Sequence, residues 1–174
     1  MYALAPDEKT TLVMAYTLSM LVRGEVVTKQ GVRVSTWLRT DAAPEYVHLV
    51  RAQVINFCGS QVKPLNAPEM FLPTEQIVGF HIVPPTQDTI DYDESEKNRI
   101  WEPITVLLGA FVIKAKARIS AQTGFGVSLV TSRVEWMSLY DAYISSPVLS
   151  QMGVLHVPLL IVRPNQVSFV VEEK

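Results

Sequence analysis

The sequence predicts an all-β protein made of two tandem, five-stranded small β-barrels. Three observations support this prediction: apolar and polar residues alternate along most of the chain, turn residues separate the alternating segments, and the two halves align with each other. The composition agrees, because a chain of 174 residues that is 48% hydrophobic and 18% charged can bury a core. That length suffices for one domain or two very small ones.

Five segments alternate with the period of two that is typical of strands with one buried face. They are residues 16–26, 31–40, 45–54, 112–120 and 135–144. They are rich in β-branched and aromatic residues and are bounded by turn-forming Gly, Asp and Pro. Residues 6–20 fit a helix no better than a strand, so a short N-terminal helix is an open alternative there.

A polar segment at residues 84–103 interrupts the alternation near the middle of the chain. It contains six carboxylates and three prolines, a composition typical of a solvated connector. We therefore expect a first barrel at residues 1–83, an acidic linker at 84–103 and a second barrel at 104–174.

The two halves align at an offset of 90 residues. Three pairs of aligned residues are identical: Glu45 and Glu135, Leu49 and Leu139, and Ala52 and Ala142. The alignment continues without a gap towards residues 80 and 170, and an offset of 91 aligns the region upstream. We interpret this register as an internal duplication. About five short strands per half are too few for a two-sheet sandwich but enough for a small barrel.

The spacing of residues in each half resembles that of the Sm and Sm-like proteins. The first half contains Gly31, Val34, Leu38, Leu49 and Ala52 at the spacing of the first signature of that family. The second half contains an apolar residue followed by Arg within residues 162–167, which resembles the second signature. The resemblance implies small five-stranded barrels that assemble into rings.

The family's RNA-binding residues are mostly replaced. The resemblance implies that an Asp, an Asn and an Arg-Gly pair would grip uridine. At the Asp and Asn positions the first half has Ala42 and Tyr46, and the second half has Trp136 at the Asn position. Arg163 is retained but is followed by Pro164 instead of Gly. Tyr46 and Trp136 are candidates for stacking on a base, although packing in a core or an interface is the simpler interpretation.

Lys114, Lys116 and Arg118 alternate along one predicted strand, so their side chains share one face at intervals of about 6.6–6.8 Å. No carboxylate lies between Thr105 and Val134. Together with Arg163, these cations form a candidate site for nucleic acid or another anion. The simpler alternative is a solvated face whose cations are neutralised by the acidic linker.

The sequence contains no motif for catalysis, cofactor binding or metal binding. Glycine-rich phosphate loops, nucleophile elbows and HExxH are absent. The three histidines are isolated from other ligands in the sequence, and Cys58 is the only cysteine. We therefore expect no enzyme activity, no cofactor and no metal site.

We expect a protein that acts through self-assembly or partner binding, as a scaffold or interaction module. Edge strands, including residues 167–171, and the aromatic residues Trp37, Trp101 and Tyr140 would form a homo-oligomer. Binding of single-stranded RNA, DNA or an anionic nucleotide through the basic strand is the alternative. The net charge of −2 and the shortness of the apolar runs predict a cytoplasmic protein with no membrane association.

Overall fold

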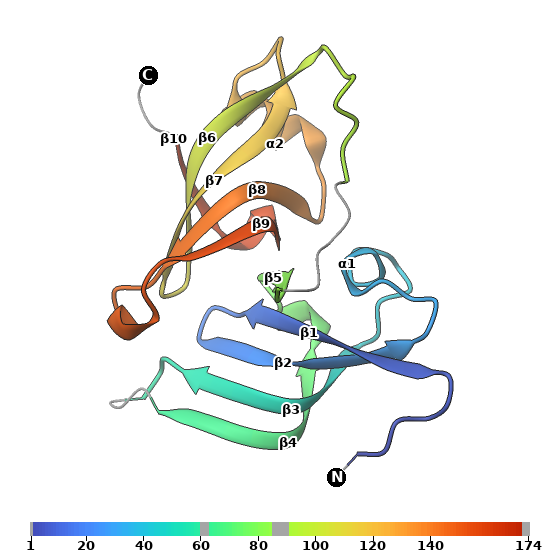
Figure 1. The fold of residues 1–174 in the computed structure, drawn as a ribbon. Helices are drawn as coiled ribbons and strands as arrows, with labels where there is room; N and C mark the ends of the chain where they lie inside the picture. The colour runs from blue at the N-terminus through green and yellow to red at the C-terminus, as the bar shows by residue number, and fades with distance from the viewer. Residues whose placement is uncertain (1, 60–62, 85–90, 172–174) are drawn as a thin grey trace. The chain divides into compact units, whose positions relative to one another are not determined.

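A computed structural model describes residues 2–59, 63–84 and 91–171 (Figure 1). The chain divides into two compact units, Met1–Asp88 and Thr89–Lys174. Within the described residues both units consist mainly of antiparallel strands, so the all-β prediction is confirmed. The division falls within residues 84–103, but residues 85–90 of the expected linker lie outside the described part of the chain.

Unit 1 contains five strands among its described residues. They are β1 (Glu8–Tyr16), β2 (Met20–Lys29), β3 (Tyr46–Asn56), β4 (Pro64–Pro73) and β5 (Gly79–Ile82), with a one-turn helix α1 (Val34–Trp37) after β2 and a 3₁₀ turn at Thr74–Gln76. The strand order is β5-β1-β2-β3-β4 (Figure 1). Each neighbouring pair is antiparallel.

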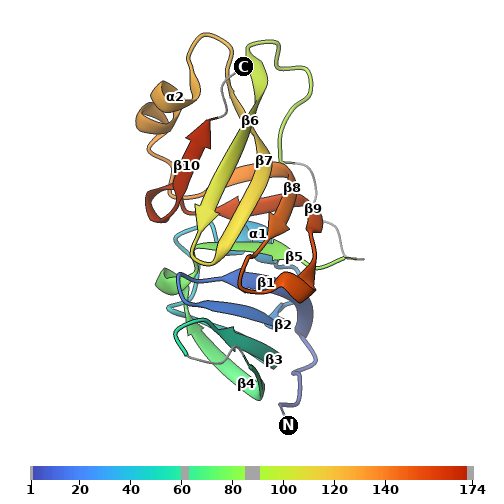
Figure 2. The same cartoon turned by 90° about the vertical axis from the view of Figure 1, so that its left-hand side faces the viewer.

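Unit 2 has the same order of elements. Its strands are β6 (Arg99–Leu108), β7 (Phe111–Ser120), β8 (Met137–Ser145), β9 (Leu155–Val162) and β10 (Ser168–Val171), with helix α2 (Phe125–Ser132) after β7 and 3₁₀ turns at Ser150–Met152 and Pro164–Gln166. The strand order is β10-β6-β7-β8-β9. Figure 2 shows α2 beside β10, where the rings of Phe125 and Phe169 lie 5.2 Å apart.

The described pairings do not close either sheet into a barrel. Within unit 1, β4 and β5 stand at opposite ends of the strand order, and β9 and β10 do the same within unit 2. The five antiparallel strands expected in each half are therefore present, but the expected closure of each half into a barrel is not supported. Closure requires hydrogen bonds between the first and last strands, and these are not among the pairings of the described residues.

The expected strands at 45–54, 112–120 and 135–144 are confirmed as β3, β7 and β8. The helix considered for residues 6–20 is wrong, because β1 runs through Tyr16 and pairs with both β2 and β5. The strand expected at 31–40 is also wrong. Val34 and Leu38 alternate with polar neighbours, but they are also four residues apart, and Val34 in α1 and Leu38 at its C-cap are both buried.

Both units have a core built from positions that the sequence alignment matched. Val22 and Ile113 are fully buried, and so are Leu49 and Leu139. These side chains come from β2 and β3 in unit 1 and from β7 and β8 in unit 2, and each of these strands has a neighbouring strand on both sides. The apolar area that they remove from water provides the main stabilisation of each unit.

Each sheet has a β-bulge at the matching position. In unit 1, two residues of β3, Arg51 and Ala52, lie opposite Gly24 of β2. In unit 2, Asp141 of β8 and its neighbour lie opposite Ala115 of β7. Arg51 has a φ of 51° and Asp141 a φ of 52°, a left-handed conformation that is uncommon for residues other than glycine. Such bulges bend the strand and increase its twist.

The residue opposite the bulge has little space. A Cβ atom placed on Gly24 would lie 3.0 Å from Cδ2 of Leu49 and 3.3 Å from the Cβ of Ala52. Only a small side chain fits at this crossing, and the matching residue of unit 2 is Ala115.

We expect Gly24→Val to lower the free energy of unfolding by about 1–3 kcal/mol, because its methyl groups would overpack the core against Leu49. Urea denaturation monitored by circular dichroism measures this change. The matched control is Gly126→Val in α2, where a new Cβ meets no atom within 4 Å. Equal stability of G24V and the wild type would contradict the proposed crowding.

A buried Tyr-His pair joins β1 to β5. The Tyr16 hydroxyl lies 3.1 Å from Nε2 of His81, and both side chains are buried. Nδ1 of His81 donates to the carbonyl of Ile82 at 3.1 Å, so Nε2 accepts the hydrogen bond from Tyr16. Burial lowers the pKa of His81 below its usual 6.5 and raises the pKa of Tyr16.

Because the pKa of His81 is lower in the folded state, the unfolded state binds more protons once the pH falls below about 6.5. We therefore expect the free energy of unfolding to decrease on acidification from neutral pH through that window. Urea titrations at neutral pH and about one unit below the ordinary histidine pKa measure the change. His81→Gln should remove this contribution, whereas His156→Gln, at an exposed position, should retain it. Identical pH dependence of H81Q and the wild type would refute the assignment.

Candidate functional site

The outer face of β6, β7 and β8 is the region where three of the four predicted cations, those of β7, lie. The alternation of β7 buries Ile113, Ala115, Ala117 and Ile119 on the core side. Lys114 and Lys116 are exposed on the opposite face and Arg118 is partly covered there. Trp101 of β6 lies directly opposite Arg118, and Tyr140 of β8 lies opposite Lys116, so these two aromatic residues share the same face.

Arg118 is held by the acidic segment that precedes β6. Its Nη2 lies 3.4 Å from a carboxylate oxygen of Glu96 and donates to the carbonyl of Asp93. Its guanidinium also lies over the ring of Tyr92, 4.7 Å from the centroid, and 5.9 Å from that of Trp101. The side chain is 11% exposed. The connector therefore neutralises this cation, as the simpler interpretation of the basic strand expected.

Three aromatic rings, one from this acidic segment and two from the sheet, pack against one another. Tyr92, Trp101 and Tyr140 meet edge to face, with ring centroids 5.0–5.2 Å apart. Such arrangements place the positive edge of one ring against the negative face of another. Next to them, the carboxylate of Asp91 accepts hydrogen bonds from Ser138 Oγ at 2.6 Å and from the Tyr140 hydroxyl.

Lys116 takes part in a charge network around the bulge of β8. Its Nζ lies 2.8 Å from Asp141, whose other carboxylate oxygen lies 2.7 Å from Nε2 of His156. Hydrogen bonds from Lys116 and then His156 lower the pKa of Asp141, and Asp141 raises the pKa of Lys116. The ring of His156 stacks on Tyr143 at 4.5 Å.

Lys114 has no ion pair within the ranges that the structure describes, and it lies opposite Tyr143 in the register of β7 and β8. Tyr143 is 46% exposed. Of the three predicted cations on β7, Lys114 is thus the one most available to an anion.

Arg163 is separate from the basic strand and lies at the end of β9. Its guanidinium stacks over the ring of Trp136 at 4.2 Å and pairs with Glu135. Trp136 is only 6% exposed, so its ring packs in the protein instead of facing a ligand. Tyr46, at the start of β3 in unit 1, is 50% exposed and lies opposite Pro73.

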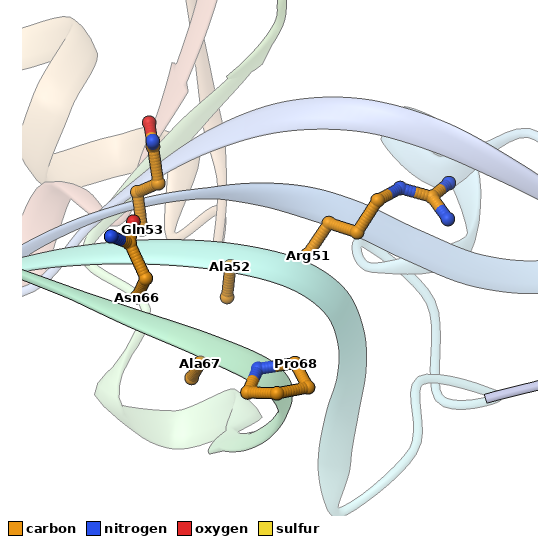
Figure 3. Close-up of a pocket in the computed structure, with 6 residues that line it drawn as sticks. All are labelled: Arg51, Ala52, Gln53, Asn66, Ala67 and Pro68. Atoms are coloured by element: carbon orange, nitrogen blue, oxygen red, sulfur yellow. The ribbon is translucent and has the colours of Figure 1, made fainter. Parts of the chain in front are cut away.

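The bulge of unit 1 lies next to a shallow pocket with a volume of about 390 Å³. It is lined by Arg51, Ala52, Gln53, Asn66, Ala67 and Pro68 (Figure 3). Figure 3 shows the amide groups of Gln53 and Asn66 pointing to the same side, with Arg51 directed away from them. Arg51 donates to Glu25 from Nε at 2.7 Å, so its charge is neutralised. The lining contains no acid, base or nucleophile suited to catalysis.

The two bulges carry ion pairs of opposite polarity. In unit 1 the left-handed residue is the cation Arg51 and its partner on β2 is Glu25. In unit 2 the left-handed residue is the anion Asp141 and its partner on β7 is Lys116. Both units thus have an ion pair at the bulge, but the cation is on the bulged strand in unit 1 and on the neighbouring strand in unit 2. This correspondence indicates a structural role for Lys116.

The remaining reactive residues do not gather. Cys58 is exposed, His48 lies 3.3 Å from Glu69 and stacks on Phe71, and His81 is buried against Tyr16. Across the described ranges, no group of three or more His, Cys, Asp or Glu residues is arranged to hold a metal ion. In the same part of the chain, no helix has the length and apolar character needed to span a membrane.

No local pattern in the sequence indicates that Tyr92, Asp91 and Ser138 belong to one site. The acidic neighbours of Tyr92 indicate a solvated connector. The sequence does contain one relevant signal, the opposite charge of the acidic connector and of a strand region that has cations but no carboxylates. That opposite charge suggests contact with the basic strand but does not show which aromatic residues participate.

Comparison with protein-family models, with curated proteins and with solved structures found no match for this chain.

We expect Arg163→Ala to lower the free energy of unfolding by about 1–2 kcal/mol, because the substitution removes the stacking of a largely covered guanidinium on Trp136. Lys114→Ala removes an exposed cation and should change stability by less than about 0.5 kcal/mol. Chemical denaturation, followed by the fluorescence of the tryptophans, measures both. A larger loss for K114A than for R163A would contradict these roles.

Proposed function

We propose that this protein is a non-enzymatic scaffold or interaction module that assembles through the edge strands of its two Sm-like units. The duplication proposed from the sequence is supported by the identical strand orders and by the matching bulges at Arg51 and Asp141. The observation that carries the proposal is the exposed apolar character of β4 and β10, which each end the strand order of their unit.

Among the described residues, β4 and β10 each have one edge with no partner strand in their unit, and both have exposed apolar side chains. On β4, Leu65 is 65% exposed and Phe71 is 59% exposed, and on β10, Val170 and Val171 are 46% and 47% exposed. A strand edge of this kind is a template for pairing with another chain unless charges or prolines block it. Neither strand carries Lys or Arg, and Glu69 of β4 is the one charged residue in the two strands.

The prolines of β4 restrict where a partner strand can pair. Pro68 and Pro73 lack an N–H donor, and between them lies the four-residue stretch 69–72. β10 is also four residues long. Pairing of β10 with residues 69–72 of another copy therefore fits the available backbone donors. Because the two surfaces differ, the contact is head-to-tail and leads to a ring or an open filament.

Binding of single-stranded nucleic acid or an anionic nucleotide is the second candidate function. Lys114 and the neighbouring exposed ring of Tyr143 favour it, since a cation beside an aromatic ring is suited to a phosphate and a base. Lys116, Arg118 and Arg163, however, each bind a carboxylate of the chain itself. For this reason we rank this function below assembly.

We expect the wild-type protein to form oligomers at micromolar concentration, and Val170→Lys to shift it towards the monomer because a charged side chain disfavours edge pairing. Light scattering coupled to size-exclusion chromatography measures the mass. Val130→Lys is the matched control, since Val130 is 76% exposed on α2 and lies outside both edge strands. A monomeric wild-type protein, or equal effects of V170K and V130K, would count against assembly through β10.

A further inference from the structure

The acidic connector segment, defined here as residues 91–96, occupies the outer face of β6, β7 and β8 in the manner of a bound peptide. None of these residues belongs to a helix or strand. The face contributes Trp101 from β6, Arg118 from β7, and Ser138 and Tyr140 from β8. The segment touches all four residues, although it is separated by only a few residues from the start of β6.

The face binds one aromatic ring of the segment. Tyr92 lies edge to face with Trp101 at 5.1 Å and with Tyr140 at 5.0 Å, and the Arg118 guanidinium covers it at 4.7 Å. The ring is therefore in contact with two aromatic residues and one cation. Edge-to-face and cation–π contacts of this kind favour an aromatic ring over an aliphatic side chain of similar size.

The face also binds an anion on each side of that ring in sequence. Asp91 accepts hydrogen bonds from two neutral hydroxyls, those of Ser138 and Tyr140. Glu96 pairs with Arg118 at 3.4 Å and with Arg99 at 3.9 Å. The chemical pattern that is recognised is thus an anion, an aromatic ring and a second anion, the last of them placed by a turn at residues 93–96.

The connector satisfies Arg118 only in part. Nη2 of Arg118 contacts both Asp93 and Glu96, whereas Nη1 is buried and has no hydrogen-bond partner among the residues that the structure describes. A guanidinium binds a carboxylate most strongly through two parallel N–H donors, and a buried donor without an acceptor is unfavourable. A peptide with a carboxylate positioned to accept from both nitrogens would therefore bind this face better than the connector does.

We propose that the outer face of β6, β7 and β8 is a recognition site for an acidic, tyrosine-containing segment of a partner protein, and that residues 91–96 occupy this site in cis. A peptide is favoured over nucleic acid because two uncharged hydroxyls hold Asp91, and because Asp141 neutralises the adjacent Lys116. The proposal concerns a surface different from the edge strands and does not depend on assembly.

Occupation in cis reduces the apparent affinity for a partner segment. The connector is covalently attached next to the site, so its effective concentration is high and only a fraction of molecules has the site open. Weakening the contacts of the connector should increase that fraction, and the apparent affinity for an external segment should rise in proportion.

The experiment uses a fluorescein-labelled peptide with the sequence of residues 91–98, DYDESEKN, and the 174-residue chain. Fluorescence anisotropy at low salt gives the dissociation constant for the wild type and for an Asp91→Ala, Tyr92→Ala double variant. We expect the double variant to bind at least about tenfold more tightly than the wild type, because its own connector no longer competes. Adding Arg118→Ala to the double variant should abolish binding.

Two controls separate recognition from general attraction to charge. A peptide in which alanine replaces the tyrosine should bind the double variant at least about tenfold more weakly, because the ring contacts are lost. Tyr46→Ala removes an exposed tyrosine of unit 1 and should leave peptide affinity at the wild-type value. Far-UV circular dichroism verifies that each variant is folded. Asp91→Asn weakens the contacts of the connector less than the double variant does, so its affinity for the peptide should lie between those of the wild type and the double variant.

Equal affinity of the wild type, the double variant and Asp91→Asn would overturn the proposal, as would binding that survives Arg118→Ala. Tighter binding of a short oligothymidylate than of the peptide by the double variant would also overturn it, in favour of nucleic acid. Since binding can be measured on V170K as well, failure of edge-strand assembly and failure of peptide recognition give separate results.

Discussion

The β-bulge on the third strand of each unit is the constraint on which the rest of the structure depends. A left-handed residue, Arg51 in β3 and Asp141 in β8, breaks the alternation of the strand and bends it. The bend requires a small residue on the neighbouring strand, Gly24 or Ala115, because the core side chains approach closely there. Each bulge also carries an ion pair across to that strand, and the two pairs have opposite polarity.

The distribution of charge explains why the basic strand of unit 2 does not form a free cationic surface. The bulge pair uses Lys116, and the acidic connector uses Arg118. The contact with the connector brings Tyr92 against Trp101 and converts a set of surface cations into a mixed aromatic and polar site. The same residues that suggested nucleic-acid binding in the sequence therefore favour recognition of an acidic peptide in the structure.

The sequence predicted the strands well where one face is buried and the other is exposed, as in β7, because the period of two then appears directly. It failed at α1, where Val34 and Leu38 satisfy both the strand and the helix pattern over a segment too short to distinguish them. It also failed at β1, where most residues are only partly buried and the contrast between the faces is weak. Of the candidate site, it identified the shared face of Lys114, Lys116 and Arg118 but not the ion pair of Lys116 with Asp141.

By itself, the sequence determined the all-β class, the acidic connector and the common face of the β7 cations, because each of these follows from local periodicity or composition. Only the tertiary structure decided which charges are neutralised, that Trp136 is buried under Arg163, and that Tyr92 returns to the aromatic residues of β6 and β8. These contacts join residues that are distant in sequence. Their formation depends on strand register and on the path of the connector, which no local pattern of residues specifies.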